Sequence, residues 1–153
     1  MAFGNEFSIA FDKSYEEVIR YIESFGRLPD EFLEFVGEEL VNIAHEAFDN
    51  ESSPLGVPWA VRKEPYASKP YKARDPASGP GAKILYRDGD LWRSVTYTVE
   101  NGKLYIGSNL RYAATHQFGD KERGIEARPY IGLSPDFEDR VLGDPAVLEL
   151  FTA

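Results

Sequence analysis

VTYTVENGKLYIG, residues 95–107, is the stretch that decides the fold. Apolar residues occupy every second position from Val95 to Val99, and alternation resumes at Leu104 and Ile106. A period of two is typical of strands, and Asn101-Gly102 tolerates the positive φ angles that a tight hairpin turn needs. The stretch therefore predicts an antiparallel β-hairpin.

Two amphipathic helices are predicted on the N-terminal side of this hairpin. Ser14-Tyr15-Glu16-Glu17 forms a capping box, and Gly26 is suited to end the helix that follows. Pro29 opens the second helix, which has a 3-4 apolar spacing typical of one buried face. The apolar positions are Tyr15, Val18, Ile22 and Phe25 in the first helix, and Leu33, Val36, Leu40, Ile43 and Ala47 in the second.

Shorter elements complete the prediction. A short strand is expected at Phe7–Phe11, and a short strand or strand end at Lys83–Tyr86. A turn at Asp88-Gly89-Asp90 leads into a helical turn or strand at Leu91. Short helices are expected at Arg111–Phe118, ended by Gly119, and at Asp136–Leu142, capped by Ser134-Pro135. The fold class is α+β: an antiparallel sheet with a central hairpin packed against N-terminal amphipathic helices.

Composition narrows the function classes. The 153 residues fit a single domain, 1–153, and the net charge of −9 disfavours tight nucleic-acid binding. The absence of cysteine excludes disulfides and thiolate metal sites. No apolar run approaches the roughly 20 residues of a membrane span, and no signal peptide is expected at the N-terminus.

Charge is uneven along the chain. Residues 1–51 carry an excess of acidic side chains and residues 52–93 an excess of basic ones. The asymmetry is compatible with copies that meet acidic face to basic segment, and equally with a solvated acidic helix face.

Residues 51–82 form a long Pro-rich loop with no apolar period, predicted to be a flexible arm. Tyr66 and Tyr71 alternate there with Lys69, Lys72 and Arg74, a pattern that can bind single-stranded nucleic acid. In an acidic protein, ordering of the arm by a neighbouring subunit is the favoured alternative.

The segment YAATHQFGD, residues 112–120, contains His116, one of two histidines. A catalytic histidine needs an orienting partner and a nucleophile, and none of Ser108, Thr115 and Asp120 stands at a recognised spacing. His116 and Asp120 offer only two metal ligands, too few for structural zinc. No catalytic, metal or cofactor site is predicted. The structural interpretation gives Tyr112 and Phe118 apolar bulk, and lets His116 and Gln117 tie the short helix to the sheet or to a neighbour.

Four ordered elements carry a resemblance: SPLGVPWA (Ser53–Ala60), KILYRDGDLWRSV (Lys83–Val95), YIGSNLRYAATHQFG (Tyr105–Gly119) and EARPYIGLS (Glu126–Ser134). Together they resemble the phage virion morphogenesis family, the tail-completion proteins of Mu-like phages and prophages. Asp120 stands where a second glycine is common, Tyr130 where Phe is usual, and Asp88 where Thr is frequent.

The resemblance implies a non-enzymatic virion protein at the tail end, assembled in the bacterial host cytoplasm and needed for joining tail to head. It implies a homo-oligomeric ring, because related tail-end proteins form rings that are often hexamers. The implied partners are the tail tube or tail terminator and head-completion proteins. DNA would pass through without specific binding, repelled by an acidic lumen.

In a ring subunit, aromatic and Arg side chains are candidate interface or structural residues. The candidates are Trp59, Trp92, Tyr112, His116, Gln117, Arg128 and Tyr130. Core packing is the alternative for the aromatic residues, and Arg128 is expected to pair with an acid, within the chain or on a neighbour, or to cap a helix end. Two other functions stay open: a monomeric interaction module, adaptor or inhibitor, that uses the basic 51–82 loop, and a hydrolase that uses His116.

Overall fold

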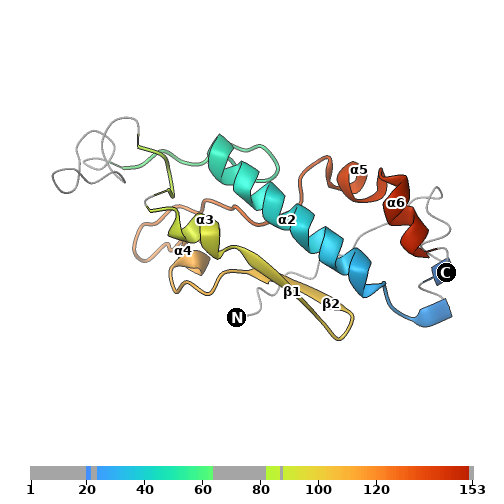
Figure 1. The fold of residues 1–153 in the computed structure, drawn as a ribbon. Coiled ribbons are helices and arrows are strands. Elements are labelled where there is room, and N and C mark those ends of the chain that lie inside the picture. The colour runs from blue at the N-terminus through green and yellow to red at the C-terminus, as the bar shows by residue number, and fades with distance from the viewer. Residues whose placement is uncertain (1–19, 22–23, 64–81, 87, 152–153) are drawn as a thin grey trace.

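The computed structural model describes residues 20–21, 24–63, 82–86 and 88–151. Helix α2, Asp30–Asn50, runs through the centre of this part, with the β-hairpin along one side and the C-terminal helices along the other (Figure 1). Every apolar position predicted for the second helix is buried, which confirms its amphipathic face. Pro29 is the residue that precedes the helix, and Glu51 ends it in a left-handed conformation with φ 51°.

The hairpin is confirmed. Strand β1, Thr96–Glu100, pairs antiparallel with β2, Lys103–Gly107, and Val99 lies opposite Leu104. Asn101 and Gly102 both have positive φ, 54° and 70°, as the tight turn requires. The fold is therefore α+β, with this two-stranded antiparallel sheet packed on α2 among the residues described.

Gly37 is the position that lets the hairpin approach α2. It is buried in the middle of the helix, and a methyl group there would overlap the ring of Tyr97 on β1. Glycine costs a helix interior roughly 1 kcal/mol relative to alanine. We infer that close contact between the helix backbone and the Tyr97 ring offsets this cost.

The first core cluster forms between α2 and the C-terminal helices α5, Phe137–Leu142, and α6, Pro145–Leu148, with the 3-10 turn η2, Glu149–Phe151. Its buried members are Phe32, Val36, Leu40, Ile43, Phe137, Val141, Leu142, Val147 and Phe151. The helix predicted at Asp136–Leu142 is present, but Ser134 does not cap its backbone, because its hydroxyl donates to the Asp136 carboxylate instead.

Arg140 joins α5 to α2 at the surface of this cluster. Its two terminal nitrogens donate to the two Glu46 carboxylate oxygens at 2.8 and 2.7 Å, and Nε donates to Asp136 at 2.8 Å. The hydrogen bonds from Arg140 lower the pKa of Glu46. The pKa of Asp136 is also lowered, first by the Ser134 hydroxyl and then by Arg140.

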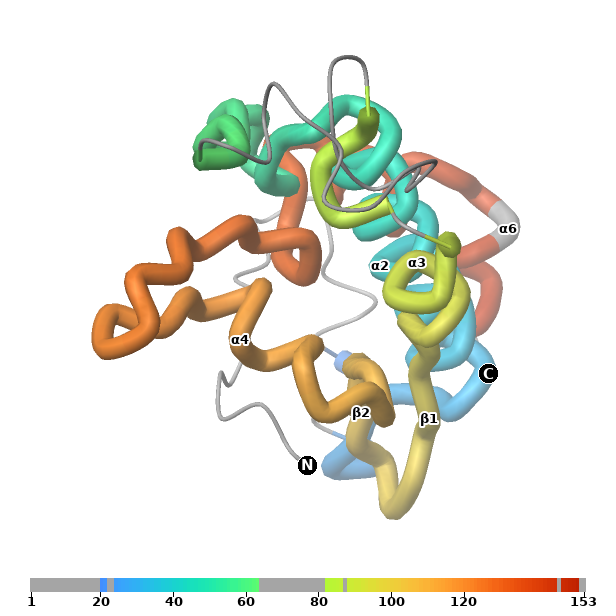
Figure 2. The backbone as a smooth tube through the Cα atoms, turned by 90° about the vertical axis from the view of Figure 1, so that its left-hand side faces the viewer, coloured from blue at the N-terminus to red at the C-terminus, as the bar shows by residue number. Residues whose placement is uncertain are grey.

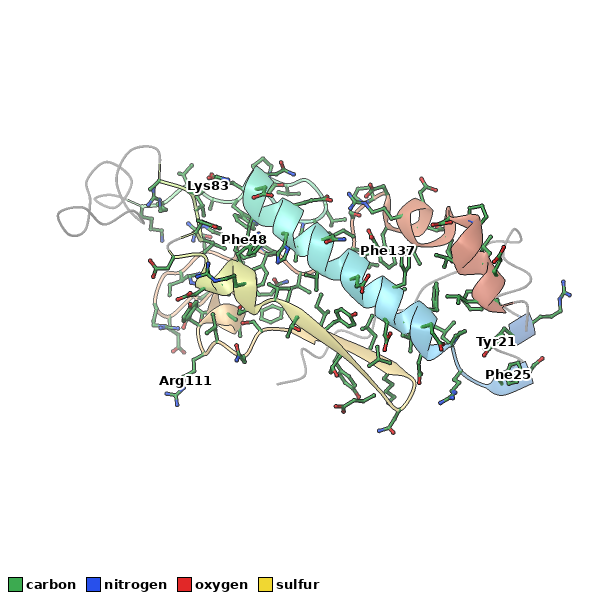
Figure 3. All side chains as sticks on the ribbon, viewed as in Figure 1. Tyr21, Phe25, Phe48, Lys83, Arg111 and Phe137 are labelled. Atoms are coloured by element: carbon green, nitrogen blue, oxygen red, sulfur yellow. The ribbon has the colours of Figure 1, made fainter. Side chains whose placement is uncertain are left out.

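The second core cluster lies at the other end of α2, against α3, Asp90–Ser94, and α4, Ala113–Phe118. Figure 2 shows α3 beside α2, and Figure 3 places Phe48 and Phe137 at separate points along α2. The buried members of the second cluster are Ala44, Ala47, Phe48, Trp59, Ile84, Leu91, Val95, Ala113 and Tyr130.

The strand predicted at Lys83–Tyr86 is wrong. Ile84 and Leu85 form a turn, and Leu85 has a φ of 59°, outside the extended region. The apolar run suggested a strand, but its side chains pack in the second cluster: Ile84 is buried there and Leu85 is partly buried against it.

The predicted strand at Phe7–Phe11, the capping box at Ser14 and the arm at 64–81 lie outside the described residues. Gly26 has a φ of 70°, in agreement with its predicted role at a helix end. Within the described ranges, no helix combines the length and the apolar composition that crossing a bilayer requires.

Candidate interaction site at the motif junction

The strap, residues 51–63, crosses the C-terminal end of α2. An isolated bridge between Ser52 and Pro58 closes its turn, and Trp59 N–H donates to the Glu51 carbonyl at 2.9 Å. The Trp59 side chain is buried edge-on against Phe48, with ring centroids 5.6 Å apart. Its indole N–H donates to the Pro129 carbonyl at 2.8 Å, so the strap is tied to a segment 70 residues away.

Arg128 ties the strap a second time. Its Nε donates to the Ala60 carbonyl at 2.9 Å and its Nη2 to the Val61 carbonyl at 3.2 Å. Among the described residues Arg128 pairs with no acid and caps no helix, and it donates instead to two backbone carbonyls of the strap. Pairing with an acid of a neighbour stays a prediction. The side chain is buried, and this burial is the main cause that lowers the Arg128 pKa.

Gln117 fixes α4 to the return segment, residues 126–131. Its amide oxygen accepts N–H groups of Tyr130 at 2.9 Å and Ile131 at 3.0 Å, and its amide nitrogen donates to the Ile131 carbonyl at 2.9 Å. Three buried or part-buried backbone groups are thus satisfied by one side chain. The tie predicted for Gln117 is present, but it joins the helix to the return segment and not to the sheet.

Tyr130 lies at the centre of the second cluster and is fully buried. Its hydroxyl donates to the Ala113 carbonyl at 3.2 Å, and burial raises its pKa to about 12. The structure therefore places Trp59 and Tyr130 in the core of the subunit, which was the alternative to an interface role. Contact with a neighbour stays a prediction for the other candidates.

His116 is half-buried beside Arg128, and its backbone carbonyl accepts the Arg128 N–H at 2.7 Å. Its Nδ1 is buried and has no hydrogen-bond partner among the described residues. Burial lowers the pKa of His116, and the nearby Arg128 charge lowers it further. The His116 ring thus lacks the orienting partner that a general base requires.

Asp120 does not complete a site with His116. Its carboxylate pairs with Arg123 at 2.6 Å, and Arg123 also donates to the Thr115 hydroxyl at 3.2 Å. A search of the described residues finds no group of three or more His, Cys, Asp or Glu side chains that could hold a metal ion. Asp120 also forms an isolated antiparallel bridge with Ile125.

Gly119 is required at the end of α4. Its φ is 74°, and an added Cβ would lie 2.8 Å from the Ala127 nitrogen and the Ile125 carbonyl oxygen. A side chain is excluded both by the conformation and by the return segment. The His-Gln-Phe-Gly sequence therefore ends in glycine because two backbone segments meet there.

Trp92 occupies the neighbouring face of α3, where it stacks on His45 of α2 with ring centroids 3.8 Å apart. The ring nitrogen Nε2 of His45 lies 3.1 Å from the Trp92 carbonyl oxygen. Trp92 is half-buried and packs against the edge of the second cluster. It is a packing residue with part of its surface exposed.

Tyr112 and Phe118 differ from the expectation. Both were predicted to supply apolar bulk, but both side chains are exposed. Three apolar side chains of the strap are exposed as well: Leu55, Val57 and Val61, the last at 78%. Because apolar side chains gain free energy when removed from water, exposed apolar residues near the junction are candidates for burial by a partner.

A cavity of about 510 Å³ opens at the junction. Its lining includes the basic side chains of Arg62, Lys83 and Arg128, together with His116 and Tyr112. Asp88 and Asp90 also line it, and Asp90 pairs with Arg93 at 2.8 Å. The cavity thus brings Arg128 beside Tyr112 and His116, which belong to one element of the sequence.

Sequence reasoning missed Gly37, the Arg140 network and the cavity. A glycine in the middle of a strongly amphipathic helix was the available signal for close packing. Nothing in the spacing of Arg140 or Lys83 indicates its partners, because these lie far away in the sequence.

The four motif elements converge on this junction. SPLGVPWA contributes Trp59, the KILYRDGDLWRSV element contributes Leu91, the His-Gln-Phe-Gly element contributes Gln117, and EARPYIGLS contributes Arg128 and Tyr130. The shared feature of the elements is therefore a structural junction that folds irregular chain against α2 and leaves an open cavity.

Residues 13–146 match the phage virion morphogenesis family, and the chain belongs to this family. It is 31% identical over 109 residues to the "Putative capsid assembly protein G" of Escherichia phage Mu, an alignment that covers 67% of each chain. It is 42% identical over 60 residues to the "Mu-like prophage FluMu G protein 2" of Haemophilus influenzae, covering 36% of this chain and 44% of that protein.

A third relative, "Uncharacterized protein MJ0331" of Methanocaldococcus jannaschii, is 34% identical over 68 residues, which cover 42% of this chain and 50% of the relative. The chain thus spans half or less of the length of two of these relatives. No solved structure matches. The protein is a structural component of phage assembly associated with the virion, and the family assignment suggests that it is not an enzyme.

Proposed function

We propose that this protein is a tail-completion subunit that forms a ring at the tail end and is needed for joining the tail to the head. The observation that carries the proposal is the family match over residues 13–146, together with the relative from phage Mu, whose name describes capsid assembly. A part that acts where tail and head meet is compatible with both descriptions.

The junction supports a structural role at the level of side chains. The polar groups of Gln117, Arg128 and the Trp59 indole donate to or accept from backbone groups, which fixes chain segments relative to one another. His116 has no partner for its Nδ1 and no adjacent nucleophile within hydrogen-bond distance among the described residues. These contacts hold chain segments in fixed relative positions, and they do not assemble a nucleophile and a base among the described residues.

Disruption of the gene in its phage or prophage tests the proposal. We expect electron micrographs of the induced lysate to contain filled heads and full-length tails that are not joined, with few infectious particles. A plasmid copy of the gene should restore joined virions. Lysates that contain normal joined particles without the gene, or no tails at all, would contradict a tail-completion role.

Ring formation is tested separately on the purified protein. We expect closed particles in negative-stain micrographs, alone or after addition of purified tails from the disrupted phage. Tails that gain no density at one end would contradict the ring.

A further inference from the structure

We propose that the cavity at the motif junction receives acidic side chains of α2 from a second copy of the chain. The inference rests on the proposed ring and names the contact that would build it. The occupant is a carboxylate of an identical subunit, and the argument comes from the charges on two separate surfaces of the structure.

The first observation is a buried cation that forms no ion pair with the residues the structure describes. Arg128 has only 9% of its surface exposed, and its guanidinium contacts two carbonyl oxygens through Nε and Nη2. Its Nη1 donates to no group among the described residues, and Arg128 is one of the residues that line the cavity. A desolvated charge is costly until an opposite charge or further hydrogen bonds compensate it.

Arg62 and Lys83 add positive charge around Arg128, whereas Asp88 and Asp90 line the same cavity and Asp90 already pairs with Arg93. Arg62 lowers the Arg128 pKa through its own charge, and Lys83 lines the same cavity. Glu126 acts in the opposite direction, but it lies beside Lys63, 4.0 Å away, and forms no ion pair with Arg128. Lys83 reaches Asp49 only at 3.9 Å, with both side chains more than half exposed. Such exposed pairs contribute little, so Lys83 can exchange its partner.

The second observation is an acidic stripe on the N-terminal half of α2. Asp30, Glu31, Glu34 and Glu38 fall within about 100° of one another around the helix axis. All of them are exposed, and Glu31 and Glu34 form no ion pair with any described residue. Acids in the first turn favour the helix dipole, and Glu38 shares a side-chain hydrogen bond with Tyr97. Glu34 lies beyond the first turn and forms no ion pair with a described residue, so these two contacts do not account for the whole stripe.

The two surfaces lie toward opposite ends of α2. Lys83 lies near the C-terminal end, whereas the stripe follows Tyr21 and Phe25 at the N-terminal end (Figure 3). Complementary surfaces at different places on one subunit produce head-to-tail contacts, which close into rings when the rotation permits. A cavity of about 510 Å³ has room for a carboxylate side chain, since small-molecule sites begin near 300 Å³.

Two charge-reversal variants test the contact. Lys83→Glu changes the cavity, and the double change Glu31→Lys with Glu34→Lys changes the stripe. Glu138→Lys on the exposed face of α5 is the control, because it changes charge by the same amount per residue away from both surfaces. Arg128 itself is left intact because it holds the strap, and circular dichroism verifies that each variant is folded.

Sedimentation velocity of the full chain at low and high salt gives the readout. We expect the wild type and Glu138→Lys to self-associate, and each surface variant to associate at least about tenfold more weakly. Association of the wild type should also weaken as salt rises. An equal mixture of the two surface variants should associate beyond dimers, because the intact cavity of one variant meets the intact stripe of the other and the reversed cavity meets the reversed stripe.

The chain that carries Lys83→Glu, Glu31→Lys and Glu34→Lys together should regain association through reversed pairs. If both surface variants still form rings, the proposed contact between cavity and stripe is wrong, whereas the proposed ring is not affected. A wild type that stays monomeric at the highest concentration, alone and with tails, would overturn both. If the cavity instead bound an acidic side chain of its own chain, Lys83→Glu would lower the stability of the monomer without changing its association.

Discussion

The two ends of α2 are built in different ways. The first core cluster packs regular helices through apolar side chains, whereas the second gathers Trp59, Leu91, Ala113 and Tyr130 from separate segments of irregular chain. Irregular backbone cannot satisfy its own polar groups, so side chains such as Gln117 and Arg128 must do so. The comparison explains why the motif elements map to the second cluster: specific side chains are required there, while the first cluster requires only apolar residues at helical spacing.

The largest expected effect tests whether both clusters are true cores. Tyr130→Ala at the junction and Phe137→Ala in α5 should each lower the free energy of unfolding by about 3–5 kcal/mol, because each leaves a large cavity. Urea denaturation measures this. Tyr130→Phe is the matched control and should cost about 1 kcal/mol, the value of the hydroxyl bond to Ala113. An equal loss for Phe and Ala would show that the hydroxyl, and not the packing, holds the junction.

The next effect separates the two regions. Gln117→Leu preserves volume but leaves the Tyr130 and Ile131 N–H groups and the Ile131 carbonyl without their partner, at a cost of about 2–3 kcal/mol. Phe137→Leu in the first cluster should cost less, about 1.5 kcal/mol. The same urea titration compares them, and a tolerated Gln117→Leu would contradict the account of the junction as a polar lock.

Gly37→Ala sharpens the comparison inside α2. Helix propensity alone predicts a gain of roughly 1 kcal/mol, but the Tyr97 ring occupies the space of the new methyl group. We expect a net loss of about 2 kcal/mol, because overpacking a close contact shifts the hairpin. Asn42→Ala, exposed on the same helix, is the control. A thermal melt that rises for Gly37→Ala would show that the hairpin is free to move away.

The smallest effects are expected from pH. The His116 pKa is lowered from its ordinary 6.5, so the folded state binds fewer protons, and stability should fall as pH drops below 6.5. The Glu46 pKa is lowered from 4.5, so the first cluster should lose stability only at more acid pH. Urea midpoints at pH 7.5, 5.5 and 3.5 separate the steps. His116→Met should abolish only the first step, and an unchanged decline between pH 7.5 and 5.5 would contradict the assignment.

Much of the regular structure was predictable from the sequence. The α2 stripe and the hairpin turn at Asn101-Gly102 follow from local periodicity and turn chemistry, and both are confirmed. The turn at Ile84 was not predictable from the sequence, because a short apolar run such as this one is typical of a strand. The positive φ of Leu85 accompanies packing of the turn in the second cluster, which is tertiary structure. Arg128 was singled out from the sequence, but its carbonyl partners lie 67 and 68 residues away, and no local pattern indicates them.

The exposed positions show the same limit. Tyr112 and Phe118 were expected to supply apolar bulk, because large aromatic side chains usually contribute to a core, but both are exposed. A short helix such as α4 buries only the side that meets the rest of the chain, here at Ala113 and Gln117. Which side that is depends on the return segment, and so on tertiary structure.

In vitro complementation tests the central claim, that this subunit completes particles by assembly, most directly. Purified protein is added to a lysate of the gene-disrupted phage that contains separate heads and tails, and plaques are counted. The account predicts a large rise in infectious particles with the wild type and with His116→Met, and little rise with Gln117→Leu or the cavity variant. A folded wild-type protein that leaves the plaque count unchanged would contradict the account. So would a His116→Met protein that still assembles but produces no rise in infectious particles.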